Sequence, residues 1–317
     1  MTDLLLVALA GFVASMVDGA LGMGFGPTSS SILLSSGLSP VAAATTVNLA
    51  KIATGIAAGV SHWRFDNIDR RIVLKLALPG AVGAVIGTTV LANVDGDDIR
   101  PALAVLLMLV GIRILHRFSA ALPTTEAAEI ASPGRAPEFD ERGLEVVAAA
   151  GGVTNGLVGA WGPVVTPFLI HRRLPPRYAI GSVNTAEVAV AVVSAGSLLT
   201  SMGGQGVELR VVVAMLLGGV VAAPLAAYVV RFLPPRLLGI AVAGLLLLTQ
   251  TREIANTANH PEIKWIAYIG IPIVLALAAF RPHIERRLRL IGAARHRDGR
   301  PEPEPRAVDH LTGGRQS

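Results

Sequence analysis

The sequence contains no cysteine, which excludes disulfide bonds, thiolate metal ligands and cysteine nucleophiles. No glycine-rich segment ends in Gly-Lys-Ser/Thr, so ATP-driven transport by this chain is disfavoured. The histidines lack metal-ligand spacing, and no nucleophile is paired with a base at membrane depth. We therefore expect no metal site, no cofactor and no enzymatic activity.

Charged residues are also scarce, at 15% of the chain, whereas hydrophobic residues make up 52%. The net charge of +5 comes from arginines and lysines gathered in a few loops and the C-terminal tail, which does not indicate nucleic-acid binding. Several apolar runs approach the ~20 residues that a membrane-spanning helix needs. The N-terminus lacks the positive region of a cleaved signal peptide, so the first run should be retained. The sequence predicts an all-α, polytopic protein whose partner is the lipid bilayer.

The first apolar run, residues 4–36, is interrupted by a glycine-rich break at residues 22–27. As one helix it would be about 50 Å long, too long for one crossing of a ~30 Å hydrocarbon core and too short for two. A hairpin of two half-helices fits better, and residues 143–170 repeat this pattern. Single helices are expected at Pro40–Val60, Arg71–Leu91, Ile99–His116, Pro176–Leu199, Leu209–Val230, Pro235–Thr251 and Ile263–Phe280.

The two halves align without gaps at a spacing of 136 residues, which indicates an internal duplication. Identical pairs include Gly26 with Gly162, Pro27 with Pro163, Leu38 with Leu174, Pro40 with Pro176, Val47 with Val183 and Asn48 with Asn184. The predicted divisions are a first membrane repeat at 1–117, a polar linker at 118–142, a second repeat at 143–252, an additional transmembrane helix at 253–281 and a basic, disordered cytoplasmic tail at 282–317.

Loop charges predict the topology. The arginine-rich loops near residues 64–71 and 171–177 are assigned to the cytoplasm, and the acidic loop at residues 95–98 to the outside. Equivalent turns of the two halves then face opposite sides, so the repeats would be inverted, as in secondary transporters. The predicted location is the cell inner (plasma) membrane, multi-pass, with a cytoplasmic C-terminus.

The two breaks are candidate substrate sites, because non-helical backbone at membrane depth is tolerated only where protein buries it or where it lines a wet cavity. Free N–H groups and the positive ends of the half-helices would suit an oxyanion. The alternative is that the glycines serve only close helix packing. The candidate substrate-binding residues at the breaks are Gly26, Pro27 and Thr28 in the first half and Trp161, Gly162, Pro163 and Thr166 in the second. For Trp161, packing is an alternative role.

Each helix that follows a break carries an asparagine and a charge three residues apart. Asn48 precedes Lys51 and Asn184 precedes Glu187, so each pair shares a helix face. Lys51 is expected to attract an anion, with both asparagines binding it, and Glu187 to carry a coupling ion such as H⁺. The alternatives are a structural ion pair or a snorkelling Lys51. Asp18, inside the first broken run, is either a second coupling-ion ligand or a cap on a half-helix.

Several segments resemble the TauE/SafE sulfite exporter family over about residues 4–253. They are residues 17–26 (VDGALGMGFG), 61–69 (SHWRFDNID), 78–80 (LPG) and 161–166 (WGPVVT). The resemblance implies a permease for small sulfur-containing anions, such as sulfite, sulfoacetate, thiosulfate or related organosulfonates.

The resulting hypothesis is a secondary transporter that exports such an anion by alternating access between the repeats. The alternatives are an anion channel and a permease for a non-sulfur small organic anion. The sequence leaves open the substrate, the coupling ion and whether the protein forms a homodimer.

Overall fold

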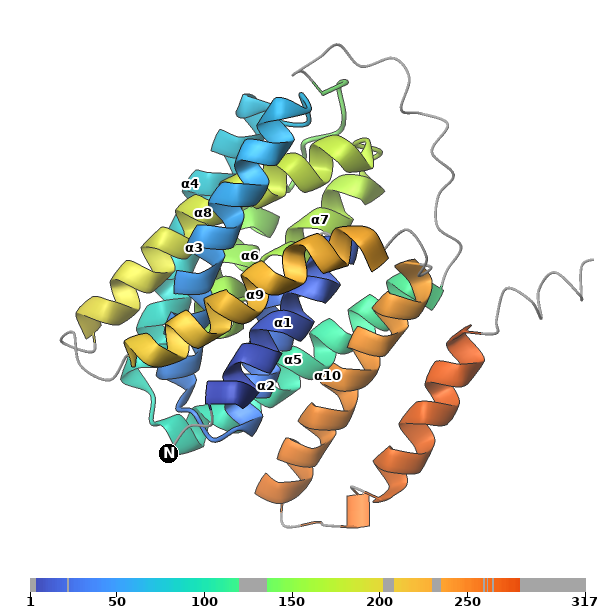
Figure 1. The fold of residues 1–317 in the computed structure, drawn as a ribbon. Coiled ribbons are helices and arrows are strands. Elements are labelled where there is room, and N and C mark those ends of the chain that lie inside the picture. The colour runs from blue at the N-terminus through green and yellow to red at the C-terminus, as the bar shows by residue number, and fades with distance from the viewer. Residues whose placement is uncertain are drawn as a thin grey trace, which may run out of the picture. The chain divides into compact units, whose positions relative to one another are not determined.

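The computed structural model describes residues 4–21, 23–119, 136–201, 208–229, 235–258, 260, 262–263 and 265–279. These residues form an all-helical protein with ten labelled helices, α1–α10, and a further helix at Trp265–Ala279 (Figure 1). Four helices, α3, α4, α5 and α8, are long and apolar enough to cross a membrane. Most of the predicted linker and the predicted tail lie outside the described residues.

The helices follow the predicted order. Their bounds are α1 Leu4–Leu21, α2 Phe25–Ser35, α3 Pro40–Arg64, α4 Arg70–Asn93, α5 Gly96–Ser119, α6 Leu144–Val158, α7 Gly162–His171, α8 Pro176–Ser201, α9 Leu209–Val229 and α10 Pro235–Thr257. Several extend past their predicted apolar ends because polar residues continue the last turn, as His62 and Arg64 do in α3. The first turns of α3 and α4 are capped: Ser39 accepts a hydrogen bond from the Ala42 amide, and Asp69 accepts one from the Arg71 amide.

Both predicted breaks are present, but the prolines lie inside the following half-helices rather than before them. α2 begins at Phe25, two residues ahead of Pro27, and α7 begins at Gly162, one residue ahead of Pro163. A proline is tolerated there because the first-turn N–H groups have no partner within the helix. Gly24 and Gly159, with φ of 136° and 70°, provide the backbone conformations that end one half-helix and begin the next.

Each broken segment packs against a helix from the other half of the chain: α1 lies along α9, and α6 lies along α4. Glycines permit the contacts. A Cβ atom at Gly11 would lie 2.1 Å from the Met215 carbonyl oxygen, and one at Gly152 would lie 2.0 Å from that of Gly80. The other large interfaces join α3 to α8 and α5 to α10. The two halves are therefore interlocked rather than set side by side.

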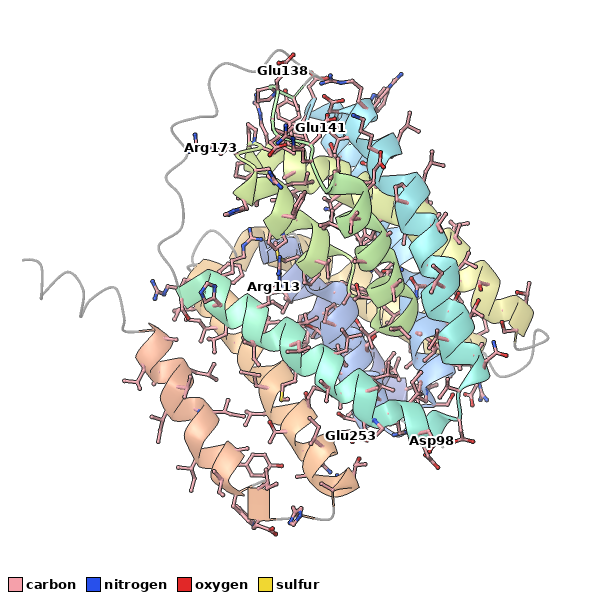
Figure 2. All side chains as sticks on the ribbon, turned by 180° about the vertical axis from the view of Figure 1, so that it is seen from behind. Asp98, Arg113, Glu138, Glu141, Arg173 and Glu253 are labelled. Atoms are coloured by element: carbon pink, nitrogen blue, oxygen red, sulfur yellow. The ribbon has the colours of Figure 1, made fainter. Side chains whose placement is uncertain are left out.

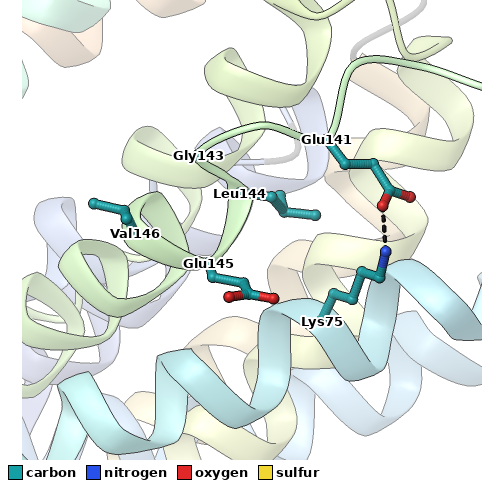
Figure 3. Close-up of a pocket in the computed structure, with 6 residues that line it drawn as sticks. All are labelled: Lys75, Glu141, Gly143, Leu144, Glu145 and Val146. Carbon is teal, nitrogen blue, oxygen red and sulfur yellow. Dashed lines mark hydrogen bonds and ion pairs between the residues drawn. The ribbon is translucent and has the colours of Figure 1, made fainter.

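Charged residues lie at both ends of the bundle (Figure 2). Glu138, Glu141 and Arg173 lie at one end, and Asp98 and Glu253 lie at the other. At the second end, Arg100 forms an ion pair with Glu253 that links α5 to α10. Lys75 of α4 pairs with Glu141 ahead of α6, beside a surface cavity of about 250 Å³ (Figure 3).

Candidate functional site

The two broken segments touch each other. A Cβ atom at Gly26 would lie 1.8 Å from the carbonyl oxygen of Gly159, so the two backbones are in direct contact. Gly159 in turn faces α3, where an added Cβ would lie 2.8 Å from Val47. A side chain at Gly26 would require the backbone to shift, and at Gly159 the positive φ of 70° also favours glycine.

A small cavity lies at this meeting point. Its volume of about 10 Å³ is roughly the space of one water molecule. The lining comes from both breaks and from α8: Asp18, Met23, Gly24, Phe25, Gly26, Pro27, Gly159, Gly162, Pro163, Asn184 and Glu187. Seven of the predicted site residues therefore share one cavity: Asp18, Gly26, Pro27, Gly162, Pro163, Asn184 and Glu187. An oxyanion is larger than a water molecule, so binding one here requires the helices to move apart.

Lys51 lies directly behind the cavity and joins three elements. Its ammonium forms an ion pair with Glu187 of α8 and is 3% exposed. It also donates hydrogen bonds to Asn155 Oδ1 at 2.7 Å and to the Gly159 carbonyl oxygen at 2.8 Å. All three ammonium hydrogens therefore have acceptors. The ion pair of Lys51 with Glu187, which the sequence offered as the alternative to their transport roles, is present. Lys51 also holds the second break in place.

Asn155, which was not among the predicted site residues, is the centre of this network. Its Nδ2 donates to Asn48 Oδ1 at 2.8 Å and to Ser194 Oγ at 3.0 Å, while its Oδ1 accepts from Lys51. A sequence signal was present, because Asn155 is a polar residue inside an apolar run. The repeat alignment hid it, since the aligned residue of the first half is Gly19.

Asn48 does not line the cavity. It is fully buried, and its Nδ2 donates to the Ala44 carbonyl oxygen at 2.9 Å while its Oδ1 accepts from Asn155. Its aligned partner Asn184 does line the cavity. The two asparagines predicted to be equivalent thus hold different positions in this conformation.

Of the two roles that the sequence left open for Asp18, the structure shows the cap. Its Oδ1 accepts a hydrogen bond from the Phe25 amide at 3.3 Å and so satisfies a free N–H group in the first turn of α2. It also lines the cavity. The cavity therefore holds two carboxyl groups, Asp18 and Glu187, with one lysine behind it.

The hydroxyl residues lie deeper than the cavity. Thr28, Ser29 and Thr166 are completely buried, and their hydroxyl oxygens have no hydrogen-bond partner among the residues that the structure describes. Ser30, on the same half-helix as Thr28, donates to the Val158 carbonyl oxygen at 2.8 Å and ties α2 to α6. The unsatisfied hydroxyls are costly unless another state of the protein gives them partners.

Trp161 lies outside the cavity lining. It is fully buried, its Nε1 donates to the Val183 carbonyl oxygen at 3.1 Å, and its ring fills the space beside Gly80 and Gly151. In this conformation Trp161 connects α7, α8 and α4. No group of three or more metal-ligating His, Asp or Glu side chains occurs within the described part of the chain.

Comparison with known proteins agrees with this description. A family model described as Sulfite exporter TauE/SafE matches residues 7–252. The probable membrane transporter protein YtnM of Bacillus subtilis (strain 168) is 37% identical over 269 residues, which cover 83% of this chain and 88% of that protein. No solved structure matches.

Proposed function

This chain belongs to the TauE/SafE sulfite exporter family of membrane transporters, and we propose that it is a secondary transporter that exports a small sulfur-containing anion such as sulfite, sulfoacetate or another organosulfonate. The observation that carries the proposal is the contact between the two broken segments, with a cavity at their junction and a buried lysine behind it. The cavity closes around the space of one water, so transport proceeds by alternating access, in which each side opens in turn.

The groups around the junction suit a tetrahedral or pyramidal oxyanion. The starts of α2 and α7 converge there, and their free N–H groups and dipoles favour negative charge. When the site opens, Thr28 and Thr166 supply hydroxyl donors that have no partner within the described residues in the closed form. Asn184 binds the anion with its side-chain amide, and Asn48 acts indirectly, through its hydrogen bond with Asn155. Trp161, the residue before α7, supports the site by packing and does not line the cavity.

Charge balance supports proton coupling. Lys51 and Glu187 neutralise each other, which leaves the Asp18 carboxyl as the excess charge beside the cavity. An anion placed next to an ionised Asp18 would be repelled in a site of low dielectric constant. A proton on Asp18 removes this repulsion, and a proton on Glu187 frees Lys51 to face the anion. Binding of the anion would therefore be linked to the protonation of these two carboxyl groups.

Helix directions support two inverted repeats at residues 1–117 and 143–252. α1 runs parallel to α9, since Gly11 faces Met215 and Gly219 faces Ser15. α6 runs parallel to α4, since Gly152 faces Gly80 and Gly156 faces Ala84.

α3 and α8 run in opposite directions: Gly55 faces Val188, and Gly59, one turn further on, faces Thr185. The helices that follow them, α4 and α9, then also run oppositely. Consequently α1 and α6 begin at opposite ends of the bundle, as expected of an inverted pair.

The proposed orientation in the cell inner membrane places residues 64–71 and 171–177, and hence the C-terminus, in the cytoplasm. Basic residues gather in those loops, whereas Asp95, Asp97 and Asp98 gather at the other end of α4. Residues from both halves of the chain line the cavity, so one chain brings the two breaks together.

The test is flux in proteoliposomes that contain the full chain, comparing sulfite, thiosulfate, sulfoacetate and taurine with and without an imposed proton gradient. We expect one sulfur anion to accumulate against its own gradient when the proton gradient is applied. Purely downhill flux of several anions would indicate a channel, and transport restricted to a carboxylate added as comparator would indicate a permease for non-sulfur anions.

Variants assign the roles. Lys51→Ala should abolish anion transport, and Glu187→Gln or Asp18→Asn should remove its dependence on the proton gradient. The matched control is the pair Lys75→Ala and Glu141→Gln. These two residues form a second Lys–Glu ion pair, which lines a different cavity at the surface (Figure 3) and is not part of the transport cavity. The assignment fails if Lys51→Ala and Glu187→Gln leave both the rate and its pH dependence unchanged.

A further inference from the structure

A second, larger cavity opens on the flank of the bundle between α3, α4 and α8, which lie together in Figure 1. Its volume is about 400 Å³, and its lining is Gly59, Val60, Trp63, Ile68, Arg70, Val73, Leu74 and Thr185. We refer to these residues as the flank groove. Leu74 and Trp63 are 62% and 64% exposed, so the groove opens outward from the bundle rather than toward the transport cavity. On a membrane-spanning helix this outward side meets lipid.

The groove has the shape that one acyl chain requires. Gly59 leaves a gap in the α3 surface, because a Cβ atom there would meet only Thr185 Oγ1, at 3.7 Å. Thr185 forms the inner end and lies nine residues after Pro176, where α8 begins. At ~1.5 Å per residue this is about 14 Å, close to half of a ~30 Å hydrocarbon core. The inner end of the groove therefore lies about one leaflet's depth along α8 from the start of that helix.

The outer end of the groove is basic. Arg70, the first residue of α4, lines the groove and is exposed. Within the described residues it forms no ion pair, whereas its neighbour Arg71 is paired with Asp69. Trp63 lies at the same end, and tryptophan is favoured at the level of lipid headgroups. An unpaired guanidinium above an apolar channel matches a lipid phosphate above an acyl chain.

We propose that the flank groove binds one anionic glycerophospholipid, with an acyl chain between Gly59, Leu74 and Thr185 and the phosphate on Arg70. The site is separate from the transport cavity, and the proposal does not depend on the identity of the transported anion. Binding bridges α3 and α8 near the contact between Lys51 and Glu187, since Gly59 lies about two turns after Lys51 and Thr185 about half a turn before Glu187. The lipid is thus bound to the two helices that carry the buried ion pair.

Native mass spectrometry of the full chain in detergent tests the proposal. The probes are phosphatidylglycerol and phosphatidylcholine with the same acyl chains, titrated separately. We expect phosphatidylglycerol to bind more tightly and Arg70→Gln to weaken it about fivefold, the effect of one basic residue on an anionic lipid. Gly59→Leu, which fills the groove, should weaken both lipids. The controls are Arg142→Gln, which removes an exposed arginine outside the groove, and Gly196→Leu, which adds the same side chain at an exposed position of α8.

The proposal is overturned if Arg70→Gln and Arg142→Gln weaken phosphatidylglycerol equally, because the preference would then reflect overall charge. It is also overturned if Gly59→Leu binds both lipids as the unmodified chain does. Far-ultraviolet circular dichroism of each variant shows that its helices are retained. Inorganic phosphate at millimolar concentration should not displace the lipid, since it has no acyl chain; displacement would identify a phosphate site instead.

Discussion

Gly26 and Gly159 are in backbone contact where the two broken segments meet, and this contact has no room for a side chain. A Cβ atom at Gly26 would lie 1.8 Å from the Gly159 carbonyl oxygen and 2.6 Å from its carbonyl carbon. The obstacle is backbone, which cannot move aside as a flexible side chain can. The same carbonyl oxygen accepts a hydrogen bond from Lys51, so displacing it also disturbs the buried ion pair.

Gly26→Ala should therefore destabilise the protein by about 3 kcal/mol, the upper range for overpacking. Thermal unfolding in detergent measures the effect. Gly196→Ala is the matched control, because an added Cβ there would meet nothing within 4 Å. Equal melting temperatures for the two variants would show that the junction is looser than described.

Replacing Lys51 alone should lower the free energy of unfolding more than replacing Lys51 and Glu187 together. Lys51→Met leaves Glu187 without its partner and is expected to cost about 3–5 kcal/mol. Adding Glu187→Gln should recover part of this loss, because no unpaired charge then remains. A double-mutant cycle of unfolding free energies in detergent measures the coupling. Additive losses would mean that the two charges do not interact.

Trp161→Phe separates packing from substrate contact. The phenyl ring keeps most of the buried surface but loses the hydrogen bond from Nε1 to the Val183 carbonyl oxygen. We expect a loss of about 1 kcal/mol in stability, the usual contribution of such a bond, with KM for the transported anion unchanged. A large rise in KM at unchanged stability would instead place Trp161 in contact with substrate.

Asp69 should make stability depend on pH. It lies in the loop before α4, outside the membrane-spanning segments, and its carboxylate accepts hydrogen bonds from Arg71 and from the Ala136 amide. Burial by itself would raise the pKa of Asp69, but these donors and the Arg71 charge hold the pKa below its ordinary value. The stabilisation is thus complete above the unfolded pKa of ~3.9 and disappears as pH falls through the lower folded value.

The measurement is the melting temperature of the protein and of Asp69→Asn between pH 3 and pH 7. The variant keeps a capping side chain at the start of α4 but lacks the charge. The difference between the two proteins should be full at pH 6–7 and shrink toward pH 3. A difference that stays constant over this range would rule out the charged form as the stabilising one.

The helix order and the two breaks were predictable because apolar length, glycine and proline are local signals. The prediction that Lys51 and Glu187 would be neighbours followed from the repeat alignment combined with the cost of charge in a membrane. The exact start of α2 was not predictable to the residue, since proline fits either before a helix or in its first turn.

The role of Asn155 could not be predicted from the repeat, because the two halves carry different residues at this position. The second half carries Asn155, which accepts a hydrogen bond from Lys51, and the first half carries Gly19 at the aligned position. The different positions of Asn48 and Asn184 have the same origin. Asn155 donates a hydrogen bond to Asn48, which is held away from the cavity, whereas Asn184 lines the cavity. Contacts of this kind depend on packing between distant segments.

The interlocking of the halves has a consequence for biogenesis. α1 is the first helix to leave the ribosome, yet its largest partner is α9, which is made almost last. Until α9 is inserted, the surface around Gly11 has only lipid or an insertion factor to cover it. In a nascent chain that stops after α8, α6 can pack against α4, but α1 lacks α9, the helix it packs against. Insertion of this protein is therefore completed from its C-terminal half, and its earliest segment is among the last to reach its final place.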